Sequence, residues 1–194
     1  APDRERFVEG NLFHDFAEFY VNHPDAVAAA GHKWLLGLWG GGFLYVDGDA
    51  AERLHPRTVG YRSVETPAAD PFVFKPGARR FEVGSANPAP HVALAEAIET
   101  VSTVGVDRIE SRIHRLAGRL GDQLPSERLL SPATPESGLV TIDVETPDAT
   151  VERLASEDIV VRSLPDPPAV RASVHAVNTE AEVDQLAAAL ADAL

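Results

Sequence analysis

The chain of 194 residues contains no cysteine and no methionine, and only two of its 17 basic residues are lysines, Lys33 and Lys75. Without cysteine, the chain has no disulfide, no thiolate metal ligand and no thiol nucleophile. The lack of methionine extends to position 1, so we expect a trimmed start or a fragment of a longer protein.

Long apolar runs are also missing. No run reaches the roughly 18 residues of a membrane-spanning helix. The charged start, Asp3-Arg4-Glu5-Arg6, is not followed by the apolar core of a signal peptide. These absences predict a cytoplasmic protein.

Acidic residues dominate the charge: 30 acids against 17 bases give a formal net charge of -13. Such a surface repels nucleic acid and anionic membranes, so we expect neither as a partner. The acid excess and the scarcity of lysine also suggest a halophilic source, because acidic surfaces stay soluble at high salt.

In the first half of the chain, apolar segments alternate with glycine-rich segments. Phe13, Phe16 and Tyr20 have the spacing of one face of a short helix. Small apolar residues at 26–30 predict a strand, the glycines that follow predict a crossing, and residues 43–46 predict a buried strand that ends in a turn at Asp47-Gly48.

The second half predicts a small α/β sandwich from about residue 97. An irregular loop is expected at 66–90. After it we expect two helices within 91–121 separated at Gly105, a strand at 139–144, a helix at 149–157, strands at 159–162 and 170–174, and a helix at 179–194. Thr179 and Glu182 have the spacing of a capping box at the start of the last helix.

Lys33 is the strongest chemical signal in the sequence. It stands in Gly31-His32-Lys33-Trp34, in a chain where arginine supplies almost all other basic side chains. Lysine differs from arginine in that it can lose its proton and form an imine with an aldehyde. From spacing alone, an ordinary solvent-facing lysine at a strand end is an equally good interpretation.

Three strings, in the same order, resemble the class V aminotransferases. They are Gly31-His32-Lys33-Trp34-Leu35-Leu36-Gly37 with the strand Gly41-Gly42-Phe43-Leu44-Tyr45-Val46 after it, Arg80-Phe81-Glu82-Val83-Gly84-Ser85-Ala86-Asn87, and Val170-Arg171-Ala172-Ser173-Val174-His175 followed by Asn178-Thr179-Glu180-Ala181-Glu182-Val183. The resemblance implies an α/β fold: part of the large domain of a pyridoxal-phosphate transferase at 1–96, and its small C-terminal domain at 97–194.

The resemblance also implies roles for four residues. Lys33 would hold pyridoxal 5'-phosphate as an internal aldimine and move protons at the substrate Cα, and His32 would lie beside the cofactor phosphate. Arg171 would bind the α-carboxylate of an amino-acid substrate. Ser85 would reach the phosphate of a neighbouring subunit, which predicts a homodimer with shared active sites. No histidine spacing indicates a metal site.

Several positions depart from the family or stay open. Ala30 replaces a residue that often carries a phosphate-binding hydroxyl, and the first half of the large domain has no counterpart. Glu9 is either a degraded form of the aspartate that pairs with the pyridine nitrogen or an ordinary exposed glutamate. Arg162 lines the substrate entrance or forms a structural ion pair.

The reaction also stays open. The lack of cysteine and the string Arg162-Ser163-Leu164-Pro165 favour isopenicillin N epimerase-like members over cysteine desulfurases. An aminotransferase, an epimerase and a lyase all fit this prediction. The alternative is a truncated, non-catalytic remnant that folds or dimerises without cofactor.

Overall fold

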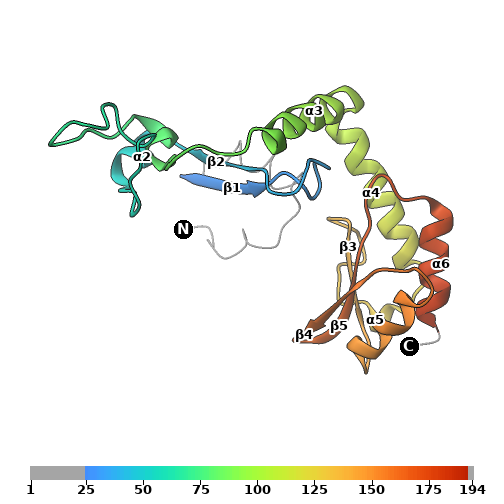
Figure 1. The fold of residues 1–194 in the computed structure, drawn as a ribbon. Coiled ribbons are helices and arrows are strands. Elements are labelled where there is room, and N and C mark those ends of the chain that lie inside the picture. Colours follow the sequence, from blue (N-terminus) through green and yellow to red (C-terminus); the bar gives the residue numbers. More distant parts are fainter. Residues whose placement is uncertain (1–24, 192–194) are drawn as a thin grey trace. The chain divides into compact units, whose positions relative to one another are not determined.

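The computed structural model describes residues 25–191. Glu9 and the helix predicted around residues 13–20 therefore lie outside the described residues. The chain divides after Thr103 into two compact units, which we call the N-terminal unit (25–103) and the C-terminal unit (104–191). Both are drawn in Figure 1.

A two-stranded antiparallel sheet forms the centre of the N-terminal unit. Strand β1 (Ala26–Ala30) pairs with β2 (Gly42–Val46), from Ala26 opposite Val46 to Ala30 opposite Gly42. The prediction of two strands around a glycine-rich crossing is confirmed, and Figure 1 shows the hairpin in blue. The prediction that the second strand is buried is wrong, since Leu44 and Tyr45 are 44% and 45% exposed and only Val46 is buried.

The predicted turn at Asp47-Gly48 is wrong, because these residues begin a short helix, α2 (Gly48–Arg53). The Asp47 carboxylate accepts hydrogen bonds from the backbone N–H groups of Asp49 and Ala50, at 2.9 and 3.3 Å. An aspartate before a glycine fits a tight turn and a helix N-cap equally well, and the apolar Ala50 and Ala51, both buried, decide for the helix.

The segment after α2 is irregular, as predicted, apart from the 3₁₀ helix η2 (Gly77–Phe81). The buried side chain of Arg80 fastens this segment to α2, since it donates to the backbone oxygen of Ala51 at 2.5 Å and to Oε1 of Glu52 at 2.6 Å. Helix α3 (Ala89–Val104) follows, and all of it except its last residue belongs to the N-terminal unit.

The C-terminal unit begins with helix α4 (Val106–Gly121), and the predicted break at Gly105 is confirmed. Gly105 adopts φ of 94°, a backbone conformation that glycine takes without the steric cost of a side chain. A 3₁₀ turn, η3 (Ser126–Arg128), follows α4.

Three antiparallel strands form the sheet of this unit, in the order β3-β5-β4. Their bounds are β3 (Leu139–Asp143), β4 (Arg162–Pro165) and β5 (Pro168–Ser173), and the helices that accompany them are α5 (Pro147–Ala155) and α6 (Glu180–Ala191). Residues from β3, β5, α4, α5 and α6 share one hydrophobic core, in which Leu116, Ile142 and Leu154 are fully buried. The mixed α/β class is confirmed.

The strand predicted at 159–162 is wrong in its bounds. The backbone N–H of Ile159 donates to the carbonyl of Leu154 at 2.9 Å and so closes the end of α5, and Val160 is 90% exposed. The strand begins instead at Arg162, because pairing with β5 through the turn between Pro165 and Pro168 sets its register.

The capping box of α6 is confirmed. The backbone N–H of Thr179 donates to the Glu182 carboxylate at 2.6 Å, and the N–H of Glu182 donates to the Thr179 hydroxyl at 3.2 Å. Each side chain thus satisfies a backbone donor that the first turn of a helix leaves unpaired.

Across residues 25–191, no helix has both the length and the apolar character that crossing a membrane requires.

Candidate functional site

The loop that carries Lys33 connects β1 to β2, and we call residues 31–41 the lysine loop. Two backbone hydrogen bonds from glycines close it: Gly31 N–H to the carbonyl of Gly41 at 3.0 Å, and Gly37 N–H to the carbonyl of Gly31 at 2.8 Å. A third bond, from Leu36 N–H to the carbonyl of Lys33 at 3.1 Å, forms a turn directly after the lysine.

Gly37 explains why the sequence is rich in glycine here. A Cβ atom at this position would lie 2.8 Å from the carbonyl oxygen of Gly31, closer than real side-chain carbons approach a backbone oxygen. Glycine therefore allows the loop to fold back on its own start, which fixes the backbone on both sides of Lys33.

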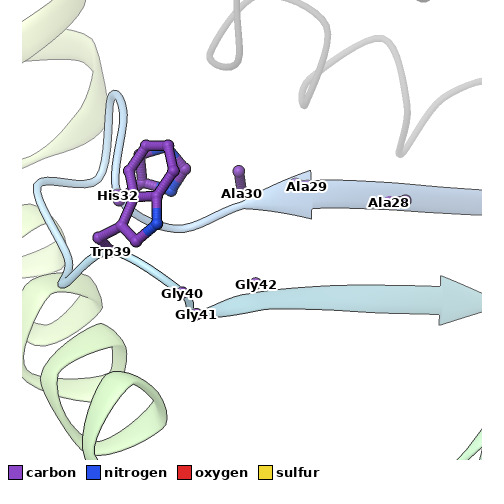
Figure 2. Close-up of a pocket in the computed structure, with 8 residues that line it drawn as sticks. All are labelled: Ala28, Ala29, Ala30, His32, Trp39, Gly40, Gly41 and Gly42. Atoms are coloured by element: carbon purple, nitrogen blue, oxygen red, sulfur yellow. The ribbon is translucent and has the colours of Figure 1, made fainter.

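His32 and Trp39 face one another across this loop (Figure 2). Their ring centroids lie 4.2 Å apart with a tilt of 50°. The His32 ring is half-buried, and its Nδ1 is buried without a hydrogen-bond partner among the described residues. Trp39, which sequence reasoning did not single out, is 81% exposed and offers an aromatic face to a ligand or a partner.

An open pocket of about 460 Å³ lies beside these two rings. Its lining consists of His32, Trp39 and the small residues Ala28, Ala29, Ala30, Gly40, Gly41 and Gly42. Figure 2 shows that the small residues come from the facing ends of β1 and β2 and from the last part of the lysine loop. Methyl groups and glycine backbone line most of the pocket. Among its described lining residues, His32 is the one with a titratable side chain.

Lys33 does not line this pocket, although it follows His32 directly. Its side chain is exposed to solvent. Ala30 does line the pocket, but it presents only a methyl group. The hydroxyl that the family often places before the Gly-His-Lys string is therefore missing at this position.

The pocket fits pyridoxal phosphate in part. The unpaired Nδ1 of His32 can donate a hydrogen bond to an anionic oxygen, and the flat wall of small residues leaves room for an aromatic ring. An exposed lysine one residue away is accessible to an aldehyde.

Ser85 lies in the loop after η2 and is not among the pocket-lining residues. Its hydroxyl is 2.5 Å from the hydroxyl of Tyr61. The hydrogen bond with Ser85 and the nearby Arg62 guanidinium hold the pKa of the Tyr61 phenol below its ordinary value. Ser85, Tyr61 and Arg62 thus lie together at the surface, and the tyrosine carried no sequence signal that would have identified it.

Arg171 and Arg162 belong to the C-terminal unit, where they are direct partners across β5 and β4. Arg171 is half-buried, and its Nε is buried without a hydrogen-bond partner among the described residues. The structural ion pair considered for Arg162 is absent within residues 25–191, since no carboxylate there lies within salt-bridge distance of its guanidinium.

No group of three or more histidine, aspartate or glutamate side chains in the described part of the chain is placed to hold a metal ion.

Comparison with known proteins gives consistent results. Residues 15–186 match the family model described as aminotransferase class V. Isopenicillin N epimerase from Streptomyces clavuligerus is 34% identical over 190 residues, which cover 88% of this chain and 47% of that protein. A cysteine desulfurase from Synechococcus elongatus is 29% identical over 177 residues, covering 83% of this chain and 28% of the other.

Among solved structures, the complex of the cystine C-S lyase C-DES with its reaction product, cysteine persulfide, is similar with a TM-score of 0.80 at 29% identity. The match covers 90% of this chain and 48% of the lyase. A lysine variant of C-DES with glycine covalently linked to its PLP cofactor gives a TM-score of 0.81, also at 29% identity, over 91% of this chain and 48% of that one. The chain thus spans about half the length of the Streptomyces epimerase (47%) and of the lyase (48%).

Proposed function

Because this chain belongs to the class V aminotransferase family, we propose that it contributes Lys33, His32 and Arg171 to a pyridoxal-phosphate-dependent enzyme that acts on an amino acid. The reaction is a transamination, an epimerisation or a lyase reaction. We further propose the domain assignment that the sequence suggested, with the cofactor lysine in 1–96 and a substrate-binding small domain in 97–194.

One observation carries the proposal. Two buried side-chain nitrogens in the described part of the chain have no hydrogen-bond partner, and they are Nδ1 of His32 and Nε of Arg171. A buried donor without a partner costs about 1–3 kcal/mol, so such atoms are rare unless a ligand satisfies them. The family resemblance assigns these same two residues to the cofactor phosphate and to the substrate carboxylate.

The roles of the chain's own residues follow from their chemistry. When bound, pyridoxal phosphate withdraws electrons from the substrate Cα. Lys33 Nζ would hold the cofactor, and as a free amine it would take a proton from the substrate Cα and return it. His32 Nδ1 would donate a hydrogen bond to a phosphate oxygen, and Arg171 would orient the substrate through a two-point contact with its α-carboxylate.

Ser85 and Tyr61 are proposed to serve a neighbouring subunit. Their hydroxyl groups are exposed and lie outside the lining of the His32 pocket, which supports a role toward the phosphate of a second copy in a homodimer. Sedimentation of the purified chain tests the homodimer. For the cellular setting, the cytoplasm remains the expectation from sequence.

The lack of cysteine limits the choice of reaction. This chain offers no thiol to receive sulfur from a substrate, so a persulfide on the enzyme would need a residue from outside it. This supports placing the reaction nearer to epimerisation or transamination than to desulfuration.

The alternative is a remnant that folds without cofactor. Two observations favour it: Ala30 gives the pocket no hydroxyl, and Lys33 does not line the pocket. A remnant would show no cofactor absorbance at any concentration of pyridoxal phosphate.

The chain's two lysines provide a well-matched experiment. We expect pyridoxal phosphate to give a visible absorbance band with the wild-type chain, and borohydride reduction to fix the label on the peptide that contains Lys33. Lys33→Arg should abolish both the band and the label, because arginine keeps the charge but forms no imine.

Lys75→Arg is the control and should change neither the band nor the label. Equal labelling of both lysines, or a band that survives Lys33→Arg, would contradict the proposal.

A further inference from the structure

Arg162 and Arg171 are placed side by side by the register of the sheet. They are Cα partners in the β4–β5 pair, so both side chains project from the same face, with Cβ atoms about 5 Å apart. On the other side of Arg171, Thr141 of β3 is its direct partner and extends the row.

That face lies opposite the hydrophobic core. Val170 and Ala172, which flank Arg171 in β5, are 0% and 2% exposed and belong to the core. Successive residues of a strand point to opposite faces, so Arg171 and its partner Arg162 lie on the face away from the core.

Two like charges directly opposite one another destabilise a sheet, and proteins normally offset them with carboxylates. Here no carboxylate of the described residues pairs with either guanidinium, although the chain has 30 acids against 17 bases. Asp143, a diagonal neighbour of Arg171 in the register, is bound instead to Nη1 of Arg128 at 3.0 Å.

The pair is therefore positively charged, uncompensated within the described residues, and includes a buried donor, Nε of Arg171, that lacks a partner. One arginine fork satisfies one carboxylate with two parallel hydrogen bonds. A second guanidinium at the neighbouring position is favourable when the ligand carries a second negative group, and is repulsive otherwise.

We infer that Arg162 and Arg171 together bind a ligand with two carboxylates, and that the substrate is an amino acid with a second carboxylate in its side chain. This inference rests on the proposed function for the role of Arg171 and adds Arg162 as the residue that determines substrate class. Arg171 holds the α-carboxylate, and Arg162 holds the distal one.

The test uses two simple probes, succinate and butyrate, which have the same number of carbon atoms but two carboxylates and one. Isothermal titration of the full chain should show that succinate binds at least about tenfold more tightly than butyrate, as expected for one additional charge-assisted contact. Arg162→Gln should remove this preference and leave butyrate binding unchanged, and Arg162→Lys should restore part of it.

Arg108→Gln is the matched control, because it removes the same charge from an exposed position of the same unit. It should leave the preference for succinate intact, whereas Arg171→Gln should weaken the binding of both probes. Circular dichroism establishes that each variant is folded.

Equal binding of the two probes to the wild-type chain would overturn the inference. An equal loss of affinity for succinate and butyrate in Arg162→Gln would also overturn it, because that result means that both arginines hold a single carboxylate. The cofactor is not needed for these titrations, so Lys33→Arg should keep the preference. A failed labelling of Lys33 would therefore contradict the proposed function, whereas a missing preference for succinate would contradict the inference about Arg162, and the two results can be told apart.

Discussion

The two units differ in how much apolar surface each buries by itself. The C-terminal unit has one core of 15 buried residues that joins its sheet to α4, α5 and α6. The buried cluster of the N-terminal unit consists, among the described residues, of Val46, Ala50 and Ala51.

The N-terminal unit also exposes large apolar side chains close to the candidate site. Within the lysine loop, Leu36, Leu38 and Trp39 are 57%, 56% and 81% exposed. Concentrated exposure of this kind marks surfaces that contact another partner. The C-terminal unit therefore carries a larger hydrophobic core of its own than the N-terminal unit, whose exposed apolar loop is consistent with the homodimer proposed above.

The largest expected effect tests the core of the C-terminal unit. Leu116→Ala should lower the free energy of unfolding by about 3 kcal/mol, because it leaves a cavity at a fully buried site. Val46→Ala, in the smaller cluster, should cost about 1 kcal/mol.

Two probes in urea unfolding separate the units. Both tryptophans, Trp34 and Trp39, lie in the lysine loop, so fluorescence reports the N-terminal unit. Far-ultraviolet circular dichroism is dominated by helices, and most of the helices within residues 25–191 belong to the C-terminal unit. We expect Leu116→Ala to shift the dichroism midpoint more than the fluorescence midpoint. Equal shifts would mean that the units unfold as one and would remove the contrast drawn here.

A medium effect tests the lysine loop. Gly37→Ala should destabilise the N-terminal unit by about 1–3 kcal/mol, since the new Cβ meets the carbonyl of Gly31 and forces the backbone apart. The same variant should also reduce the cofactor label on Lys33.

Gly48→Ala is the control, because a Cβ there meets nothing within 4 Å. Its free energy of unfolding should stay within about 0.5 kcal/mol of the wild type. Its labelling at Lys33 should equal that of the wild type within experimental error. A Gly37→Ala variant as stable as Gly48→Ala would contradict the tight packing of the loop.

The smallest effect concerns the cap of α6. Thr179→Ala should cost about 1 kcal/mol, as is typical for the loss of an N-cap side chain. The backbone hydrogen bond from Thr179 holds the pKa of Glu182 below its ordinary value, and the Thr179 and Asn178 side chains act in the same direction.

The sign of the pH effect follows from this lowered pKa. The unfolded carboxyl, with a pKa of about 4.3, binds its proton before the folded one does. The stabilisation is therefore present above about pH 4.3 and is lost as the pH falls through the folded pKa. Acid titration followed by circular dichroism should show a shallower loss of stability in Glu182→Gln than in the wild type; an unchanged slope would argue against the capping role.

Much of the fold was predictable because its signals are local. The break at Gly105 depends on one residue that tolerates φ of 94°, and the capping box depends on two side chains three residues apart. The strands on either side of the lysine loop were evident from apolar runs that glycines interrupt. Such features need no knowledge of distant parts of the chain.

The errors arose where packing and strand pairing, which propensity does not report, decide between local options. Ile159 and Val160 have strand propensity, yet a bond to Leu154 holds one at the end of α5 and leaves the other exposed. Asp47 suits a turn as well as a cap, and the burial of the alanines after it selects the helix.

For the candidate site, the sequence by itself determined the family and the candidate residues: one lysine beside a histidine in a glycine-rich loop, and one arginine in a string typical of the class V aminotransferases. The tertiary structure decided which atoms lack partners and which side chains are neighbours. The tilted ring contact between His32 and Trp39 and the unpaired Nε of Arg171 arise from packing. The pairing of Arg162 with Arg171 arises from strand register, which a shift of one residue would abolish.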